Sequence, residues 1–124
     1  MNDKAAEIGA VNSHFMNAHG LHHKEHYTTA YDMALIGREA ISIPEFRQIA
    51  GTRTYTIPAT NKNEERWISN THPFIKKNVV YEGVFAGKTG STSLAGNCLV
   101  TCAERNGMKI YDMPVEWQED YNTT

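Results

Sequence analysis

The chain lacks several features that mark whole classes of protein. Its 124 residues contain no apolar run near the roughly 20 residues that cross a bilayer. Lysine and arginine number 12 against 14 acidic residues, for a formal charge of −2, so no basic surface suited to nucleic acid is expected. Residues 1–7 are polar and do not form a signal peptide. These absences argue against nucleic acid as a partner, and any membrane contact would come through parts outside this chain.

Cysteine is also scarce, with two residues at Cys98 and Cys102. On one strand they would face the same side about 13 Å apart, at 3.3 Å per residue. A disulfide requires Cα atoms within about 7 Å. We therefore expect both to be small buried apolar side chains.

The apolar pattern divides the chain into helices followed by strands. Thr29 and Asp32 have capping-box spacing at the start of a helix. Pro44 can open the next helix, and Asn106-Gly107 predicts a two-residue type I′ hairpin. The expected helices are 1–9, 29–41 and 44–51, the expected strands are 52–57, 84–89, 97–103 and 108–113, and residues 67–75 fit either a short helix or a strand.

Strands grouped after helices predict an α+β domain in which helices pack on an antiparallel sheet. These few short elements bury little for a chain of this length, and the first helix has no N-cap, so we expect elements of the domain to be missing. The chain alone is expected to be marginally stable or to associate through exposed sheet edges.

The triplet Lys88-Thr89-Gly90 ends one apolar strand and precedes another. A substrate with a free carboxylate needs a fixed cation and a hydroxyl donor. Because alternate residues of a strand face opposite sides, Lys88 and Thr89 share one site only if the strand twists or ends there. Gly87 and Gly90 permit this, and Gly90 leaves room for a substrate backbone.

In this context the triplet resembles the Lys-Thr-Gly signature of penicillin-recognising serine enzymes, whose other signatures are Ser-x-x-Lys and Ser-x-Asn. Residues 1–9, 14–21, 26–34 and 87–100 resemble, more narrowly, the serine-type D-alanyl-D-alanine carboxypeptidases, which are low-molecular-mass penicillin-binding proteins. Residues 1–124 are thus similar to the C-terminal part of that catalytic domain. The resemblance implies a partial penicillin-binding/β-lactamase-like transpeptidase fold.

The resemblance also implies site roles. Lys88 would supply the site's positive charge and, with Thr89, bind the substrate carboxylate. The backbone N–H of Ser91 would be an oxyanion-hole donor, and the backbone of residues 88–91, including Gly90, would pair with the peptide as an added strand. The residues expected at the rim are His19, Gly20 and Leu21. No metal or organic cofactor is implied.

The chain departs from the family in having no Ser-x-x-Lys and no Ser-x-Asn at any of its serines, which are Ser13, Ser42, Ser69, Ser91 and Ser93. Acylation has no route without a nucleophile and its base. We expect these elements upstream of Met1, and the family's C-terminal helix also to be missing. The chain alone should be inactive.

The function expected of the parent protein is removal of the terminal D-alanine of peptidoglycan stem peptides through an acyl-enzyme, outside the cytoplasmic membrane of a bacterium, with binding of β-lactams. Two alternatives stay open. One is a non-catalytic module that binds peptides or β-lactams, and the other is an unrelated α+β interaction domain.

Histidine is concentrated in one short stretch, where zinc ligands at suitable spacing are conceivable. The five residues are His14, His19, His22, His23 and His26. The stretch is rich in asparagine and glycine, which favours a polar surface loop, and we predict no metal site there.

Overall fold

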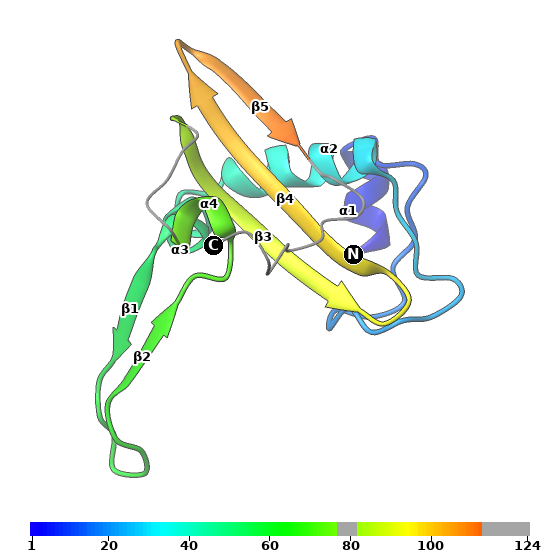
Figure 1. The fold of residues 1–124 in the computed structure, drawn as a ribbon. Coiled ribbons are helices and arrows are strands. Elements are labelled where there is room, and N and C mark those ends of the chain that lie inside the picture. Colours follow the sequence, from blue (N-terminus) through cyan, green and yellow to red (C-terminus); the bar gives the residue numbers. More distant parts are fainter. Residues whose placement is uncertain (77–81, 113–124) are drawn as a thin grey trace, which may run out of the picture.

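The structure is a computed structural model that describes residues 1–76 and 82–112 (Figure 1). Four helices and five strands lie within these ranges. In chain order they are α1 (Asn2–Glu7), α2 (Ala30–Ile41), α3 (Pro44–Gly51), β1 (Thr54–Ile57), β2 (Arg66–Ser69), α4 (Pro73–Lys76), β3 (Val84–Thr92), β4 (Gly96–Arg105) and β5 (Met108–Asp112). None of the described helices has the length and apolar character needed to cross a membrane.

The helix boundaries follow local chemistry. Thr29 is the N-cap of α2, and its side chain accepts a hydrogen bond from the backbone N–H of Asp32, which confirms the predicted cap. Pro44 stands at the start of α3, where its missing N–H costs nothing. The predicted first helix is shorter than expected, because it ends at Glu7 and Gly9 already has a φ of +88°.

Strands β3, β4 and β5 form an antiparallel meander in that order. Asn106 and Gly107 have φ values of 52° and 80°, as the predicted type I′ turn requires. Strand β3 continues to Thr92, three residues beyond its predicted end. The predicted end of the last strand at Met113 and the segment from Pro114 onward lie outside the described residues.

A second, two-stranded sheet pairs β1 with β2 and extends away from the meander (Figure 1). The ambiguous stretch 67–75 therefore holds most of a strand and the start of a helix. All of β2 is exposed, including Trp67 at 76% and Ile68 at 52%. Because neither face is buried, the sequence has no alternation of apolar and polar residues to mark this strand.

Helices α2 and α3 pack against the meander, which confirms the α+β class. The core consists of Ile41 from α2, Ala86 from β3 and Cys102 from β4, with Phe85 packed beside them. Arg47 of α3 lies 4.1 Å from the centre of the Phe85 ring, in a cation–π contact.

The cysteines only partly match their prediction. Cys102 is 3% exposed, and burial raises the pKa of its thiol, with a smaller opposing effect of Arg47. Cys98 is only partly buried, and the two are not joined by a disulfide.

Candidate functional site

The Lys-Thr-Gly triplet lies on β3, which is an edge strand of the meander as far as the chain is described. Lys88 pairs across the sheet with Val100, on the face that α2 covers, since Gly37 of α2 approaches Val100. Thr89 pairs with Leu99 and so faces the other side. The two side chains therefore leave the strand in opposite directions, as the sequence predicted.

Both residues nevertheless line one cavity of about 310 Å³, called here the strand-edge cavity. The strand continues past Thr89 to Thr92, so of the two predicted conditions, a twist or an end of the strand, only a twist remains. The other residues that line the cavity come from α3, the end of β2, the segment before α4 and β3 itself. They are Phe46, Ile49, Ala50, Ser69, Asn70, Thr71 and Gly87.

Lys88 is exposed, and its ammonium donates a hydrogen bond to the backbone carbonyl of Thr89. It has no ion-pair partner among residues 1–76 and 82–112. A positive charge held beside a concave, partly apolar wall favours an anionic ligand.

Thr89 is half-buried, and its Oγ1 lies 2.7 Å from Oγ1 of Thr71. This contact joins the triplet to a segment 18 residues away in the sequence. The secondary structure of that segment was ambiguous from the sequence, and no site role was predicted for it. The one local sequence feature there is His72-Pro73. Proline is common at the start of a helix, and it restricts the backbone conformation of the residue before it.

His72 lies fully buried under β3 and fixes this segment. Its Nε2 is 3.0 Å from Oγ1 of Thr101, and its Nδ1 accepts from the backbone N–H of Phe74 at 3.3 Å. Burial lowers the pKa of His72 below 6.5, while a hydrogen bond to the backbone of Val100 partly offsets this. A neutral imidazole with its proton on Nε2 fits these contacts.

Gly87 has a packing role beside the predicted one of letting the strand twist, which stays a prediction. A Cβ placed on Gly87 would lie 2.2 Å from Cδ2 of His72 and 2.5 Å from the carbonyl oxygen of Val100. Because Gly87 has no side chain, the imidazole of His72 can occupy the space beside it.

Gly90 and Ser91 continue the edge beyond Thr89. A Cβ on Gly90 would meet nothing within 4 Å, which leaves the space over the strand open, as the predicted approach of a substrate backbone requires. The Oγ of Ser91 donates to Oδ1 of Asn97 on β4 at 2.9 Å. The side chain of Ser91 is thus engaged across the hairpin.

The predicted rim residues form a separate turn between α1 and α2. Asn17 closes it by accepting from the N–H of Gly20 at 2.9 Å and donating to the carbonyl of Leu21 at 3.1 Å. His19 accepts from the N–H of Leu21 through Nδ1 at 3.1 Å. None of these residues lines the strand-edge cavity, so the structure does not bring them together with Lys88 and Thr89 there.

The histidines of this loop support its backbone. Nδ1 of His26 accepts from the N–H of Met16, and Nδ1 of His23 accepts from the N–H of Glu25. Nδ1 of His14 bonds to the carbonyl of Glu25. In the described parts of the chain, no three His, Cys, Asp or Glu side chains converge as metal ligands would.

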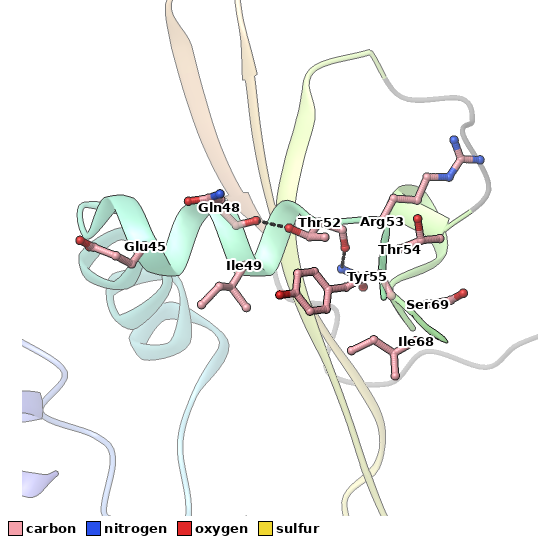
Figure 2. A pocket seen from close by; sticks show the side chains of 10 residues that line it. Glu45, Gln48, Ile49, Thr52, Arg53, Thr54, Tyr55, Ile68 and Ser69 are labelled. Atoms are coloured by element: carbon pink, nitrogen blue, oxygen red, sulfur yellow. Dashed lines mark hydrogen bonds between the residues drawn. The ribbon is translucent and has the colours of Figure 1, made fainter. Parts of the chain in front are cut away.

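A larger cavity of about 750 Å³, the hairpin cavity, lies between α3 and the β1–β2 hairpin (Figure 2). Its apolar side chains are Ile49, Tyr55 and Ile68, which Figure 2 shows around one hollow. It shares Ile49, Ser69 and Asn70 with the strand-edge cavity, so the two are neighbours. It has no lysine, and its titratable side chains are Glu45, Arg53 and Tyr55.

Comparison with known proteins identifies the family of the chain. Residues 1–115 match the family described as D-alanyl-D-alanine carboxypeptidase, and the chain belongs to that family. D-alanyl-D-alanine carboxypeptidase DacF of Bacillus subtilis is 36% identical over 109 residues. That match covers 88% of this chain and 27% of DacF, so the chain spans about a quarter of the relative's length.

Solved structures give the same result for the fold. A D-alanyl-D-alanine carboxypeptidase of Mycobacterium tuberculosis has a TM-score of 0.75 at 32% identity, over 91% of this chain and 42% of the other. A DD-transpeptidase of Streptomyces has a TM-score of 0.77 at 29% identity, over 90% of this chain and 43% of the other. Membership of the family excludes the alternative of an unrelated interaction domain.

Proposed function

We propose that residues 1–124 are part of the catalytic domain of a serine-type D-alanyl-D-alanine carboxypeptidase and provide its carboxylate-binding side. The observation that carries this proposal is the strand-edge cavity, which Lys88 and Thr89 both line. A cation and a hydroxyl donor together match a terminal carboxylate. The fused-ring carboxylate of a β-lactam would occupy the same place.

In the reaction, a serine hydroxyl attacks the carbonyl of the penultimate D-alanine, and the terminal D-alanine leaves as an amine that has gained a proton. Water then hydrolyses the acyl-enzyme. The N–H of Ser91 would stabilise the oxyanion, and the edge backbone at Gly90 would pair with the stem peptide. The sequence contains no Ser-x-x-Lys, so the nucleophile and base would come from another segment of the protein.

The proposed function also extends to the rim of the site, the location of the protein and the association of the chain. His19, Gly20 and Leu21 would form the outer rim on the side of the stem peptide. The substrate is peptidoglycan, so the protein would act outside the cytoplasmic membrane of a bacterium. The 124-residue chain by itself would self-associate, because β3 offers an unpaired edge among the described strands and large apolar side chains are exposed.

The test uses the extended protein, meaning this chain together with upstream coding sequence that carries Ser-x-x-Lys. Release of D-alanine from a peptide ending in D-Ala-D-Ala is measured. Lys88→Ala and Thr89→Val should each lower kcat/KM by about tenfold or more, the size of a lost charge-assisted hydrogen bond. Lys62→Ala, an exposed lysine in the β1–β2 loop, is the matched control and should leave the rate unchanged. Equal rates for all four proteins would refute the proposed site.

A further inference from the structure

Two threonine hydroxyls lie in contact on residues that line the strand-edge cavity. Oγ1 of Thr71 and Oγ1 of Thr89 are 2.7 Å apart, a full hydrogen bond, and both residues line the cavity beside Lys88. A threonine hydroxyl carries one proton and can accept as well. If Thr71 donates to Thr89, then the proton of Thr89 is left to point at a ligand.

Thr71 is held in place from both sides. The side-chain amide of Asn70 donates to the carbonyl oxygens of Ala50 and Thr52 at 3.2 and 2.9 Å, and its Oδ1 accepts from the N–H of His72 at 2.8 Å. On the other side, His72 is buried against Thr101. Thr71 itself is exposed to the cavity. An exposed hydroxyl between two fixed neighbours has a defined position at little entropic cost.

We propose that Thr71 is a positioning residue for carboxylate recognition, donating its proton to Thr89 so that Thr89 donates its own to the substrate carboxylate. This rests on the proposed function of Thr89. Thr71 affects selectivity for a free carboxylate and does not touch the reacting carbonyl. Asn70 and His72 also contribute to carboxylate recognition, because their hydrogen bonds fix the backbone on either side of Thr71.

The test measures acylation of the extended protein by benzylpenicillin and by its methyl ester, which lacks the charged carboxylate. Thr71→Val keeps the shape of the side chain and removes the hydroxyl. It should lower the acylation rate constant for the acid by about tenfold, the size of one lost hydrogen bond to a charged group. The rate with the ester should not change, and Thr71→Ser should restore the rate with the acid.

Three further measurements separate a positioning role of Thr71 from a general effect of the substitution and from failure of the role proposed for Thr89. Thr56→Val, the same change at an exposed residue of β1, should leave both rates as in the wild type. The double variant Thr71→Val with Thr89→Val should be no slower than Thr89→Val alone, because the two act through one hydroxyl. Equal losses for acid and ester, or no loss with the acid, would overturn the role of Thr71. A wild-type protein that does not prefer the acid would instead overturn the carboxylate role of Thr89.

Discussion

At the scale of single residues, the fit between Gly87 and His72 makes a direct prediction. Gly87→Ala would place a methyl group 2.2 Å from the buried imidazole and 2.5 Å from a backbone oxygen, neither of which can retreat freely. Overpacking of this kind should lower the free energy of unfolding by about 1–3 kcal/mol. Urea unfolding of the extended protein measures it.

Gly90→Ala is the matched control for this substitution. It adds the same methyl group three residues along β3, where nothing lies within 4 Å. Its effect should stay within about 0.5 kcal/mol. Equal stabilities for the two variants would contradict the role of Gly87 as space for His72.

His72 also predicts how stability depends on pH. Its pKa is lowered in the folded protein, so the unfolded chain takes up the proton first as the pH falls through 6.5. The folded state therefore loses stability below that pH, until the folded imidazole is protonated as well. His72→Gln removes this titration, so the stability advantage of the wild type should shrink between about pH 7.5 and pH 5.5. A constant difference in the free energy of unfolding over that range would contradict the assignment.

Among the site residues, those contiguous in sequence could be predicted and those joined only by the fold could not. Lys88, Thr89 and Gly90 form a motif whose residue types suit a carboxylate. Thr71 is brought to Thr89 because the neighbouring helix α4 packs against β3, and a lone threonine in a polar stretch gives no sign of that. The same applies to His72, since a histidine between Thr71 and Pro73 gives no sign in the sequence that its side chain is fully buried.

At the scale of elements, the β4–β5 turn depends on a residue with positive φ. Asn106 has φ 52°, and alanine in this left-handed region costs about 1–2 kcal/mol. Asn106→Ala should therefore lower the free energy of unfolding by about 1 kcal/mol. Asn61→Ala, at an exposed loop residue whose φ is not positive, should change it by less than about 0.5 kcal/mol. Similar effects of the two would show that the meander does not depend on this turn.

Elements with a local start or turn signal in the sequence were the predictable ones. The Thr29 cap and the start at Pro44 defined α2 and α3, and the Asn106-Gly107 turn set the register of β4 and β5. The type of β2 and α4 stayed ambiguous within residues 67–75, because β2 buries neither face and α4 has four residues, too few for a helical pattern.

At the scale of the whole molecule, the described part of the chain buries little apolar surface and exposes much. The large side chains more than 60% exposed are Met1, Val11, Leu21, Tyr31, Ile49, Trp67, Leu94 and Met108. The 124-residue chain should therefore sediment as a mixture of associated species, while the extended protein should be monomeric. A single monomeric species with a cooperative thermal transition for the short chain would contradict this prediction.

The most direct measurement is labelling by a fluorescent penicillin, read on a denaturing gel, of this chain beside the extended protein. Labelling of the extended protein alone, weakened by Thr89→Val, is the predicted result, since under the proposed function this chain would supply the carboxylate-binding side and another segment the nucleophile. No labelling of either protein would favour a non-catalytic binding module. Labelling of the short chain would mean that one of its own serines is the nucleophile and that the proposed division of the site is wrong.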